Sequence, residues 1–301
     1  MNILGIESSC DETAAAVVAD GRRILSSVVA SQVALHRPYG GVVPELASRS
    51  HIEAIAPVVD QALAEAGLGV NDIEGVSVTQ GPGLVGCLLV GFCFAKAFAF
   101  ARGVPWVGVD HLAAHLNSVQ LIDDPPGFPL VALLASGGHT ALYYLESLEH
   151  QVLLGQTRDD AAGEAYDKVA KMLGLGYPGG AAIERLAARG DARRIAFTRP
   201  YLDKAPFEFS FSGLKTAVYR HIQTQPRAAE KNVALVGGVA ANGALRQSLN
   251  AAAGAKGIRV FVPPLTLCGD NAAMIAAVGH NALQAGSVSP LDADVYSRHR
   301  I

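Results

Sequence analysis

A pair of histidines, His111 and His115, stands four residues apart in the stretch VGVDHLAAHLNSVQ. On a helix, residues i and i+4 lie about 5–6 Å apart at Cβ, so both imidazoles can reach one metal ion. The hydrolytic motif H-E-x-x-H has a glutamate beside its first histidine, whereas this chain has Leu112 there. Two ordinary helical histidines are the commoner explanation of the bare spacing. A metal also needs a third ligand. Asp270 in CGDNAA is a candidate, although an aspartate at a predicted helix start also suits an N-cap.

Glycine turns after predicted strands are candidates for phosphate or nucleoside binding. In ASGGHT, Gly137 and Gly138 either turn backbone amides toward a phosphate or form a plain hairpin turn at positive φ. In VGGVAANGALR, Asn242 follows two glycines that let a ring or a sugar approach the backbone; the alternative is a strand-to-helix junction softened by glycine. We interpret a third junction, GPGLVG, as structural. No stretch matches the Walker pattern G-x-x-x-x-G-K-[ST].

Acidic side chains form a third group of candidates. The ESSCDET turn carries Glu7, Asp11 and Glu12 between two predicted strands. Three carboxylates in one turn indicate either a site that handles amines or cations, or a solvated turn held by local hydrogen bonds. Asp167 lies on a predicted helix that ends at a Tyr-Pro-Gly-Gly turn. There it accepts ribose hydroxyls or pairs with Lys171 one turn later.

These residues lie on strands and helices that alternate along the chain, which predicts an α/β fold with mixed or parallel sheets. Both halves open with a strand, a turn and a second strand, which suggests a duplication whose two lobes surround one ligand. We expect lobes at 1–125 and 126–285, with a tail at 286–301 that returns to the first lobe. The predicted strands are 2–6, 13–19, 24–30, 75–80, 106–110, 128–135, 141–146, 232–238 and 258–264. The predicted helices are 44–66, 84–101, 161–173 and 178–189, with two more that start near residues 242 and 270.

Composition restricts the class of protein. Half of the 301 residues are hydrophobic, which is enough for a sizeable core in one large domain or two ordinary ones. The net charge of -3 excludes a globally basic surface, so any nucleic-acid contact needs a local patch or a partner. Four cysteines without a CxxC pair, and no signal peptide, indicate reduced thiols in the cytoplasm. The apolar run Leu84–Phe100 contains Lys96 and is expected to form a buried helix of a soluble protein.

Taken in order, these motifs resemble those of the universal tRNA N6-adenosine threonylcarbamoyltransferases, formerly described as O-sialoglycoprotein endopeptidases. The resemblance runs from residue 2 to about residue 280. It implies a two-lobed actin-like, Hsp70-like and sugar-kinase-like α/β fold with duplicated mixed-sheet domains and a central cleft. The matching stretches are GIESSCDETAAAVV, YGGVVPELASRSH, GPGLVG, DHLAAH, SGGHT, YDKVAKMLGLGYPGG, FSFSGLKTAV, GGVAANGALR and CGDNAAMIA.

The resemblance implies an acyl transfer. Bacterial members take threonylcarbamoyl-AMP, made by a separate adenylate-forming synthase. They pass the threonylcarbamoyl group to N6 of adenosine 37 in tRNAs that read codons beginning with A. Because the nucleophile is then an amino group and not water, Leu112 in place of a water-activating glutamate is expected. By position, His111, His115 and Asp270 hold one divalent metal ion, iron in the first place and zinc as the alternative.

The other candidates take their roles from the same resemblance. Asp11 and Glu12 are matched positions that matter for activity, and either is a candidate to accept the amine proton. Glu184 lies in the segment that follows Gly180, and Asp270 is expected to contact the substrate as well as the metal. The nucleoside is expected at Asp167, Gly180 and Asn242, and the phosphate and acyl portion at Leu134, Ala135, Ser136, Gly137 and Gly138.

Partners and alternatives complete these expectations. A degenerate paralogous subunit and a small ATPase are expected to complete the tRNA surface, with Arg37, Arg49 and the RHR tail at 298–300 as local cations. The main alternative is an actin-like ATPase or small-molecule kinase. A protease is disfavoured because this chain lacks the glutamate of H-E-x-x-H. A non-catalytic scaffold is disfavoured because such a subunit would lack the histidine pair. One departure concerns the segment between Val218 and Asn232, where family members carry a longer helical insert.

Overall fold

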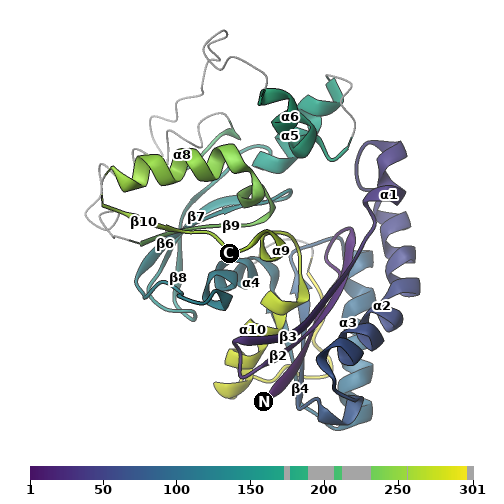
Figure 1. Cartoon of the computed structure of the whole chain (residues 1–301). Coiled ribbons are helices and arrows are strands. Elements are labelled where there is room, and N and C mark those ends of the chain that lie inside the picture. The colour runs from purple at the N-terminus through teal and green to yellow at the C-terminus, as the bar shows by residue number, and fades with distance from the viewer. Residues whose placement is uncertain (173–176, 189–206, 212–231, 256, 297–301) are drawn as a thin grey trace. The chain divides into compact units, whose positions relative to one another are not determined.

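The structure is a computed structural model that describes residues 1–172, 177–188, 207–211, 232–255 and 257–296. The chain divides into two compact units (Figure 1). Unit 1 contains Met1–Asp123 and Asp270–Ile301, and unit 2 contains Asp124–Gly269. The segment 219–231, the side chain of Lys171 and the RHR tail lie outside the described residues.

Unit 1 is built on a five-stranded mixed sheet in the order β3-β2-β1-β4-β5. β1 pairs antiparallel with β2, and β2 with β3, whereas β4 pairs parallel with β1 and β5 with β4. All residues of β2 after its first are buried, which is typical of a strand covered on both faces. The strands are β1 (Asn2–Glu7), β2 (Glu12–Ala19), β3 (Arg23–Ser31), β4 (Gly75–Gly81) and β5 (Trp106–Asp110).

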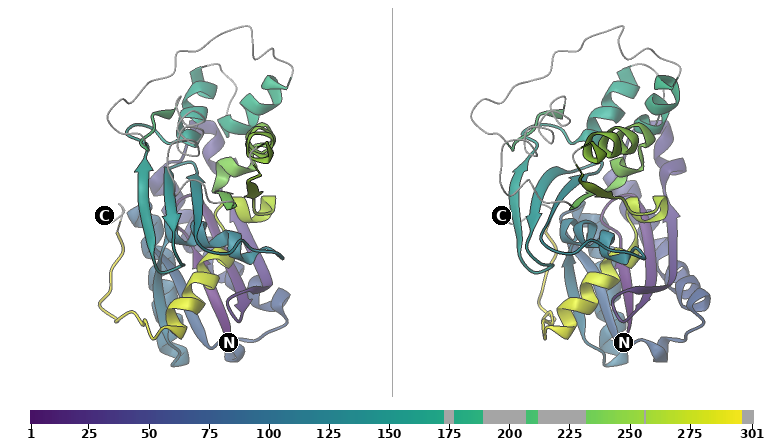
Figure 2. Two further views of the ribbon diagram at one scale, coloured as in Figure 1. Left: turned by 90° about the vertical axis from the view of Figure 1, so that its left-hand side faces the viewer. Right: turned by 60° about the vertical axis from the view of Figure 1, so that its left-hand side comes forward.

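Helices cover both faces of this sheet. The α-helices of unit 1 are α1 (Val33–His36), α2 (Pro44–Ala66), α3 (Val85–Arg102), α4 (His111–Asn117) and α10 (Ala272–Gln284). α2 and α3 lie on one face and α10 on the other (Figures 1 and 2). Leu4 and Ile6 of β1 belong to the core under α2 and α3, so Gly5 between them faces α10. A Cβ on Gly5 would lie 2.3 Å from the carbonyl oxygen of Ala272, so this close approach of α10 requires glycine.

α3 confirms the helix expected from the apolar run. By length and composition alone it is also long and apolar enough to cross a membrane. Of this helix 33% is buried, so it is covered along one face and not all round. The buried face includes Leu88 and Phe92, and the Phe92 ring meets the ring of Trp106 edge-on at 5.3 Å between centroids.

α10 belongs to unit 1, so the expected lobe boundary at residue 285 is wrong. The helix packs on β1, β4 and β5, where its small residues allow close contact with the sheet. After α10 the chain stays on unit 1. The Ser289 amide donates to the Trp106 carbonyl at 3.1 Å, and the Gln80 side-chain amide donates to the Asp294 carbonyl at 2.5 Å.

Unit 2 repeats the plan of unit 1 with a sheet in the order β10-β9-β6-β7-β8. β6, β7 and β8 are antiparallel, and β9 and β10 extend the sheet in parallel to β6. In each unit, therefore, the first strand lies at the centre, between an antiparallel hairpin pair and a parallel pair. The duplication suggested by the sequence is confirmed. The strands are β6 (Leu130–Ala135), β7 (Thr140–Leu145), β8 (Gln151–Gln156), β9 (Asn232–Val236) and β10 (Arg259–Phe261).

The described helices of unit 2 are α5 (Ala162–Met172), α6 (Gly179–Ala187), α8 (Gly243–Gly254) and α9 (Leu265–Cys268). α8 covers one face of the second sheet, where Leu245 and Leu249 pack on a core that includes Val131 and Leu235 (Figure 2). α5 and α6 pack on each other and follow the β6–β8 hairpins in the chain. Their bounds agree with the helices predicted over 161–173 and 178–189 within two residues.

Candidate metal centre and nucleotide pocket

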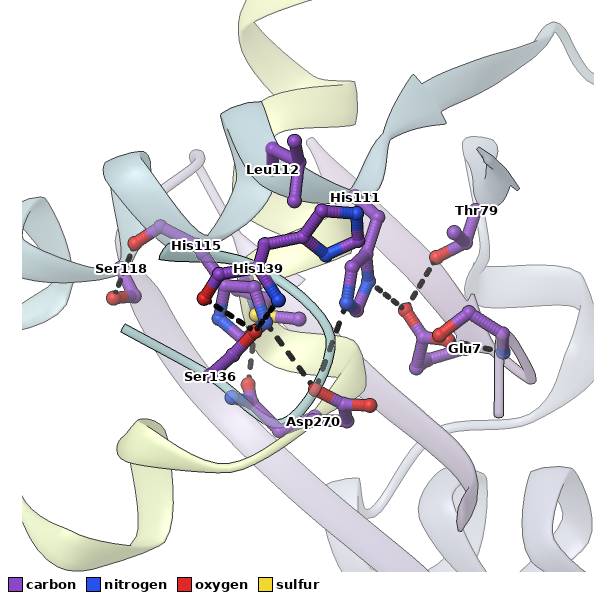
Figure 3. A network of polar contacts seen from close by, with 12 residues as sticks. Glu7, Thr79, His111, Leu112, His115, Ser118, Ser136, His139 and Asp270 are labelled. Atoms are coloured by element: carbon purple, nitrogen blue, oxygen red, sulfur yellow. Dashed lines mark hydrogen bonds and ion pairs between the residues drawn. The ribbon is translucent and has the colours of Figure 1, made fainter. Parts of the chain in front are cut away.

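α4 begins directly at the end of β5, and its start is set by Asp110. The Asp110 carboxylate accepts hydrogen bonds from the amides of Leu112 and Ala113, at 2.9 and 3.0 Å, and so caps the first turn. The rings of His111 and His115 then lie on one side of the helix with centroids 4.6 Å apart (Figure 3). Both side chains are buried, so this is not an ordinary exposed histidine pair.

Asp270 lies beside both histidines. Its Oδ1 is 3.2 Å from Nε2 of His115 and 3.7 Å from Nε2 of His111 (Figure 3). The interpretation of Asp270 as the N-cap of α10 is wrong. Asn271 takes that role, because its side-chain oxygen accepts from the Met274 amide at 3.0 Å. The carboxylate of Asp270 therefore remains directed at the imidazoles.

The donor atoms of His111, His115 and Asp270 fit one metal ion. They all lie within 4.8 Å of one another. Ligands bound at 2.0–2.2 Å in a tetrahedron are roughly 3.4 Å apart, which is close to the 3.2 and 3.7 Å that separate Asp270 from the two imidazoles. Among the described residues, neither ring nitrogen of His115 makes a hydrogen bond, although both are buried. Its Nε2 faces the Asp270 carboxylate at 3.2 Å outside hydrogen-bond geometry, and a metal ion held by both groups would satisfy this buried nitrogen.

Glu7 joins this centre from β1, a contact that the sequence did not indicate. The side chain is fully buried and receives hydrogen bonds from the Ser9 amide and the Thr79 hydroxyl. Its Oε2 also lies 3.1 Å from Nδ1 of His111. Burial alone would lower the pKa of His111, but the carboxylates of Asp270 and Glu7 outweigh it and raise the pKa to about 9. Burial would conversely raise the pKa of Glu7, and the charge and hydrogen bond of His111 lower it overall.

Asp11 lies in the turn between β1 and β2, Glu12 is the first residue of β2, and both are partly exposed. Burial, and then the negative charges of Asp270, Asp11 and Glu7, raise the pKa of Glu12 to about 8. The turn is held by the buried His51. Its Nε2 lies 3.0 Å from the Cys10 carbonyl oxygen, and its Nδ1 lies 2.7 Å from the Thr13 hydroxyl. These contacts fix the turn on the rest of unit 1, so it is not a freely solvated loop.

In unit 2, the turn between β6 and β7 exposes two glycines. Gly137 and Gly138 both lack a positive φ, so the alternative of a plain hairpin turn at positive φ does not apply to them. The backbone amides of Gly137 and Gly138 make no hydrogen bond within the described part of the chain. α5 is tied to the turn, since the Gly163 amide donates to the Ser136 carbonyl at 3.1 Å. A Cβ on Gly163 would lie 2.7 Å from the Gly137 Cα, a close approach that sequence reasoning missed.

A pocket of about 260 Å³ lies next to this turn, within unit 2. It gathers predicted residues from four separate stretches of the chain. Its lining includes Gly137, Asp167, Gly180, Glu184 and Asn242. Tyr166 also lines it and adds an aromatic ring that the sequence did not single out.

Three polar side chains of the pocket brace its walls. Asp167 accepts from the Gly179 amide at 2.7 Å and so holds the start of α6. Glu184 accepts from the Gly243 amide at 2.8 Å, and Asn242 caps α8 through the Leu245 amide at 2.9 Å. Each of these contacts uses one side-chain oxygen.

Sequence comparison finds close relatives. A family profile described as tRNA N6-adenosine threonylcarbamoyltransferase matches residues 23–277. The protein of that name from Desulforapulum autotrophicum is 55% identical over 331 aligned positions, which cover 100% of this chain and 99% of that protein. The one from Geobacter sp. (strain M21) is 50% identical over 98% of this chain and 95% of its own length. Since this chain has 301 residues, an alignment of 331 positions means that the first relative carries about thirty residues that this chain lacks.

Solved structures share the fold. The ROK hexokinase from Thermus thermophilus matches with a TM-score of 0.54 at 17% identity, over 95% of this chain and all of the hexokinase. Full-length HypF in its phosphate- and nucleotide-bound form matches with a TM-score of 0.60 at 12% identity, over 96% of this chain and 47% of HypF. These likenesses confirm the actin-like and sugar-kinase-like fold class, and at such low identity they show the fold alone.

Proposed function

The chain belongs to the tRNA N6-adenosine threonylcarbamoyltransferase family and is a transferase, and from this premise we propose its donor, its acceptor and its metal. The proposed donor is threonylcarbamoyl-AMP. The proposed acceptor is N6 of adenosine 37 in tRNAs that read codons beginning with A. The observation that carries the proposal is the convergence of His111, His115 and Asp270. A small-molecule kinase of this fold has no need of a histidine-held metal, so the donor set favours the transferase.

The proposed transfer forms one bond and breaks one. The N6 amino nitrogen attacks the carbamoyl carbon, and the bond from that carbon to the phosphate oxygen breaks, so that AMP leaves with the electron pair. The amine gives up a proton, for which Glu12 is the proposed acceptor. Its pKa of about 8 is close to the working range of a general base at neutral pH. Because the mixed anhydride is already activated, correct placement of the two reactants supplies much of the rate.

We propose that His111, His115 and Asp270 hold one divalent ion, iron or zinc. Two imidazoles and one carboxylate suit both ions. When bound, the ion supplies Lewis-acid polarisation of a carbonyl or phosphoryl oxygen. The chain itself contributes the rigid placement of α4 by the Asp110 cap. Leu112 stands where H-E-x-x-H has its water-activating glutamate, which agrees with attack by an amine.

Unit 2 is proposed to bind the adenylate part of the donor. The exposed amides of Gly137 and Gly138 are suited to phosphate oxygens, as backbone amides in glycine turns commonly are. Leu134, Ala135 and Ser136 lead into this turn at the end of β6. The nucleoside is assigned to the adjacent pocket, with Asp167, Gly180, Glu184 and Asn242 in its lining. Its volume is close to the lower end of the range for small-molecule sites.

We further propose that the protein works in the cytoplasm with a degenerate paralogous subunit, a small ATPase and a donor-supplying synthase. The net charge of -3 supports the need for partners, because tRNA binding draws mainly on Lys and Arg contacts to phosphates. Arg49 is engaged by Glu45 at 2.8 Å, which reduces its value as a free cation. Tight binding of tRNA by the isolated chain at physiological salt would contradict this part.

Nucleoside mass spectrometry tests the proposal. tRNA is incubated with the chain, the partner proteins and threonylcarbamoyl-AMP, beside an Asp270→Ala variant. Asp292→Ala, which removes an exposed carboxylate on the tail, is the matched control. We expect a threonylcarbamoyl mass on adenosine with the wild type and the control, and none with Asp270→Ala. If metal-loaded wild type forms no product while the donor stays intact, the proposed donor and acceptor are wrong.

A further inference from the structure

We propose that Glu7 is a positioning residue that holds the His111 ring so that Nε2 is the nitrogen offered to the metal. The inference rests on the proposed metal role of His111. Glu7 itself does not reach the metal or the substrate in this assignment. It acts through His111.

The geometry around Glu7 is built by the sheet. β1 and β4 are parallel neighbours with Ile6 paired to Val78, so the next residues, Glu7 and Thr79, emerge at the same edge of the sheet. The Thr79 hydroxyl donates to Oε2 of Glu7 at 2.6 Å, and the Ser9 amide donates to Oε1 at 2.5 Å. His111, which follows β5 at the same edge, places Nδ1 3.1 Å from Oε2 (Figure 3).

This arrangement selects one tautomer of His111. An ionised carboxylate is a pure acceptor, so the ring nitrogen that faces it carries the hydrogen. With the hydrogen on Nδ1, the lone pair of the neutral imidazole is on Nε2. Nε2 is the atom that faces Asp270, at 3.7 Å. Glu7 therefore prepares the correct ligand atom, as carboxylates behind metal-bound histidines commonly do.

His115 provides the contrast within the same helix. Neither of its ring nitrogens makes a hydrogen bond with any residue that the structure describes. The Asp270 carboxylate faces its Nε2 at 3.2 Å, but no carboxylate that the structure describes is hydrogen-bonded to its Nδ1, as Glu7 is to Nδ1 of His111. The effect of changing Glu7 should therefore be confined to His111, although both histidines lie on α4.

Glutamine is an informative replacement because it keeps the size of Glu7 and removes one acceptor. Three donors converge on the two oxygens of Glu7, and an amide has a single oxygen. If the amide nitrogen occupies the Oε1 position, it opposes the Ser9 amide hydrogen. If it occupies the Oε2 position, it donates toward His111, whose hydrogen then moves to Nε2. That tautomer has no lone pair on Nε2, the nitrogen that faces the proposed metal position.

The test measures zinc affinity of the full chain by competition with a chelating dye. The tautomer of the neutral His111 ring is measured by long-range proton–nitrogen NMR at a pH above its pKa of about 9. We expect Glu7→Gln to bind zinc about 10–100-fold more weakly, the usual effect of losing such a partner. Thr79→Val, which leaves Glu7 less firmly held, should cost less. Thr79→Ser, which keeps the hydroxyl, should restore wild-type affinity. Glu65→Gln, at the exposed end of α2, is the matched control and should change nothing.

Each outcome decides a separate question. Unchanged zinc affinity and an unchanged His111 tautomer in a folded Glu7→Gln would overturn the inference while leaving the proposed function intact. If neither the wild type nor any variant binds zinc or ferrous iron, the metal assignment fails and the inference fails with it. If Glu7→Gln does not fold by circular dichroism, Thr79→Val decides. A folded Thr79→Val with wild-type affinity would then count against Glu7.

Discussion

Replacing Glu12 with glutamine is expected to stabilise the metal-free protein above pH 8 while it reduces transfer. Burial and the charges of Asp270, Asp11 and Glu7 raise the pKa of Glu12 from 4.5 to about 8. A raised folded-state pKa means that the protonated form suits the fold better. The contribution of protonated Glu12 to the free energy of unfolding is fully present below the pKa of the unfolded state, and it is lost as the pH rises through about 8. Glutamine resembles the protonated form and removes this loss.

The magnitude follows from the shift. One pKa unit corresponds to about 1.4 kcal/mol, so the full shift of Glu12 would be worth roughly 4–5 kcal/mol. The side chain is still partly exposed, and solvent screens its neighbours, so we expect about 1–3 kcal/mol. In a protein of this size, each kcal/mol raises Tm by about 2–4 °C. The variant should therefore melt several degrees above the wild type at pH 9 and close to it at pH 5.

The assay is thermal unfolding of both proteins at pH 5, 7 and 9 in the presence of a chelator. Addition of zinc or ferrous iron is an internal control, because a cation on Asp270 offsets one of the charges that raise the pKa of Glu12. The stability gap at pH 9 should then shrink. An equal gap at pH 5 and pH 9 would refute the reasoning, because a gap independent of pH cannot arise from ionisation of Glu12.

Three further predictions concern the metal and the two units. Metal affinity should rise about tenfold per pH unit between pH 7 and 9, since His111, with its pKa near 9, must give up a proton to bind. Calorimetry in two buffers would detect the proton release, and a metal affinity independent of pH would contradict the prediction. Asn271→Ala should lower the free energy of unfolding by about 1 kcal/mol, because it removes the N-cap of α10. Asp270→Ala should instead abolish metal binding with little change in helix content, as metal analysis and circular dichroism would show. Gly163→Ala should weaken AMP binding by calorimetry because its Cβ would press on Gly137, and unchanged affinity would exclude this turn from the nucleotide site.

The helices and strands were largely predictable from local sequence. The helix expected over 44–66 is observed as Pro44–Ala66, where proline suits the first turn and Gly67 ends the helix in a left-handed conformation. Several strands are shorter than expected, and β8 was not expected at all. The strand expected over 258–264 covers Arg259–Phe261, because Pro263 and Pro264 have no amide hydrogen to give to a sheet. Periodicity, caps and turns act within a few residues, so a single sequence reveals them.

For the candidate metal centre, the sequence suggested His111, His115 and Asp270, but it did not indicate the contact with Glu7. His111 and His115 are four residues apart, so helix geometry alone places their side chains on the same face. Asp270 and its neighbour Asn271 are both good N-caps, and local chemistry could not decide between them. The choice depends on how α10 docks against β1, where Gly5 fixes the approach of Ala272. Packing therefore decided that the aspartate faces the histidines.

Glu7 illustrates the limit most clearly. In the sequence it is grouped with Asp11 and Glu12, as one of three acids in a turn. In the fold, β1 continues through Glu7, and parallel pairing with β4 places Thr79 beside it and His111 within reach. The sequence by itself determined the elements, the duplicated α/β plan and the likeness to a transferase family. Only the tertiary structure decided which acid touches which histidine, because strand pairing joins residues about a hundred positions apart that no local pattern links.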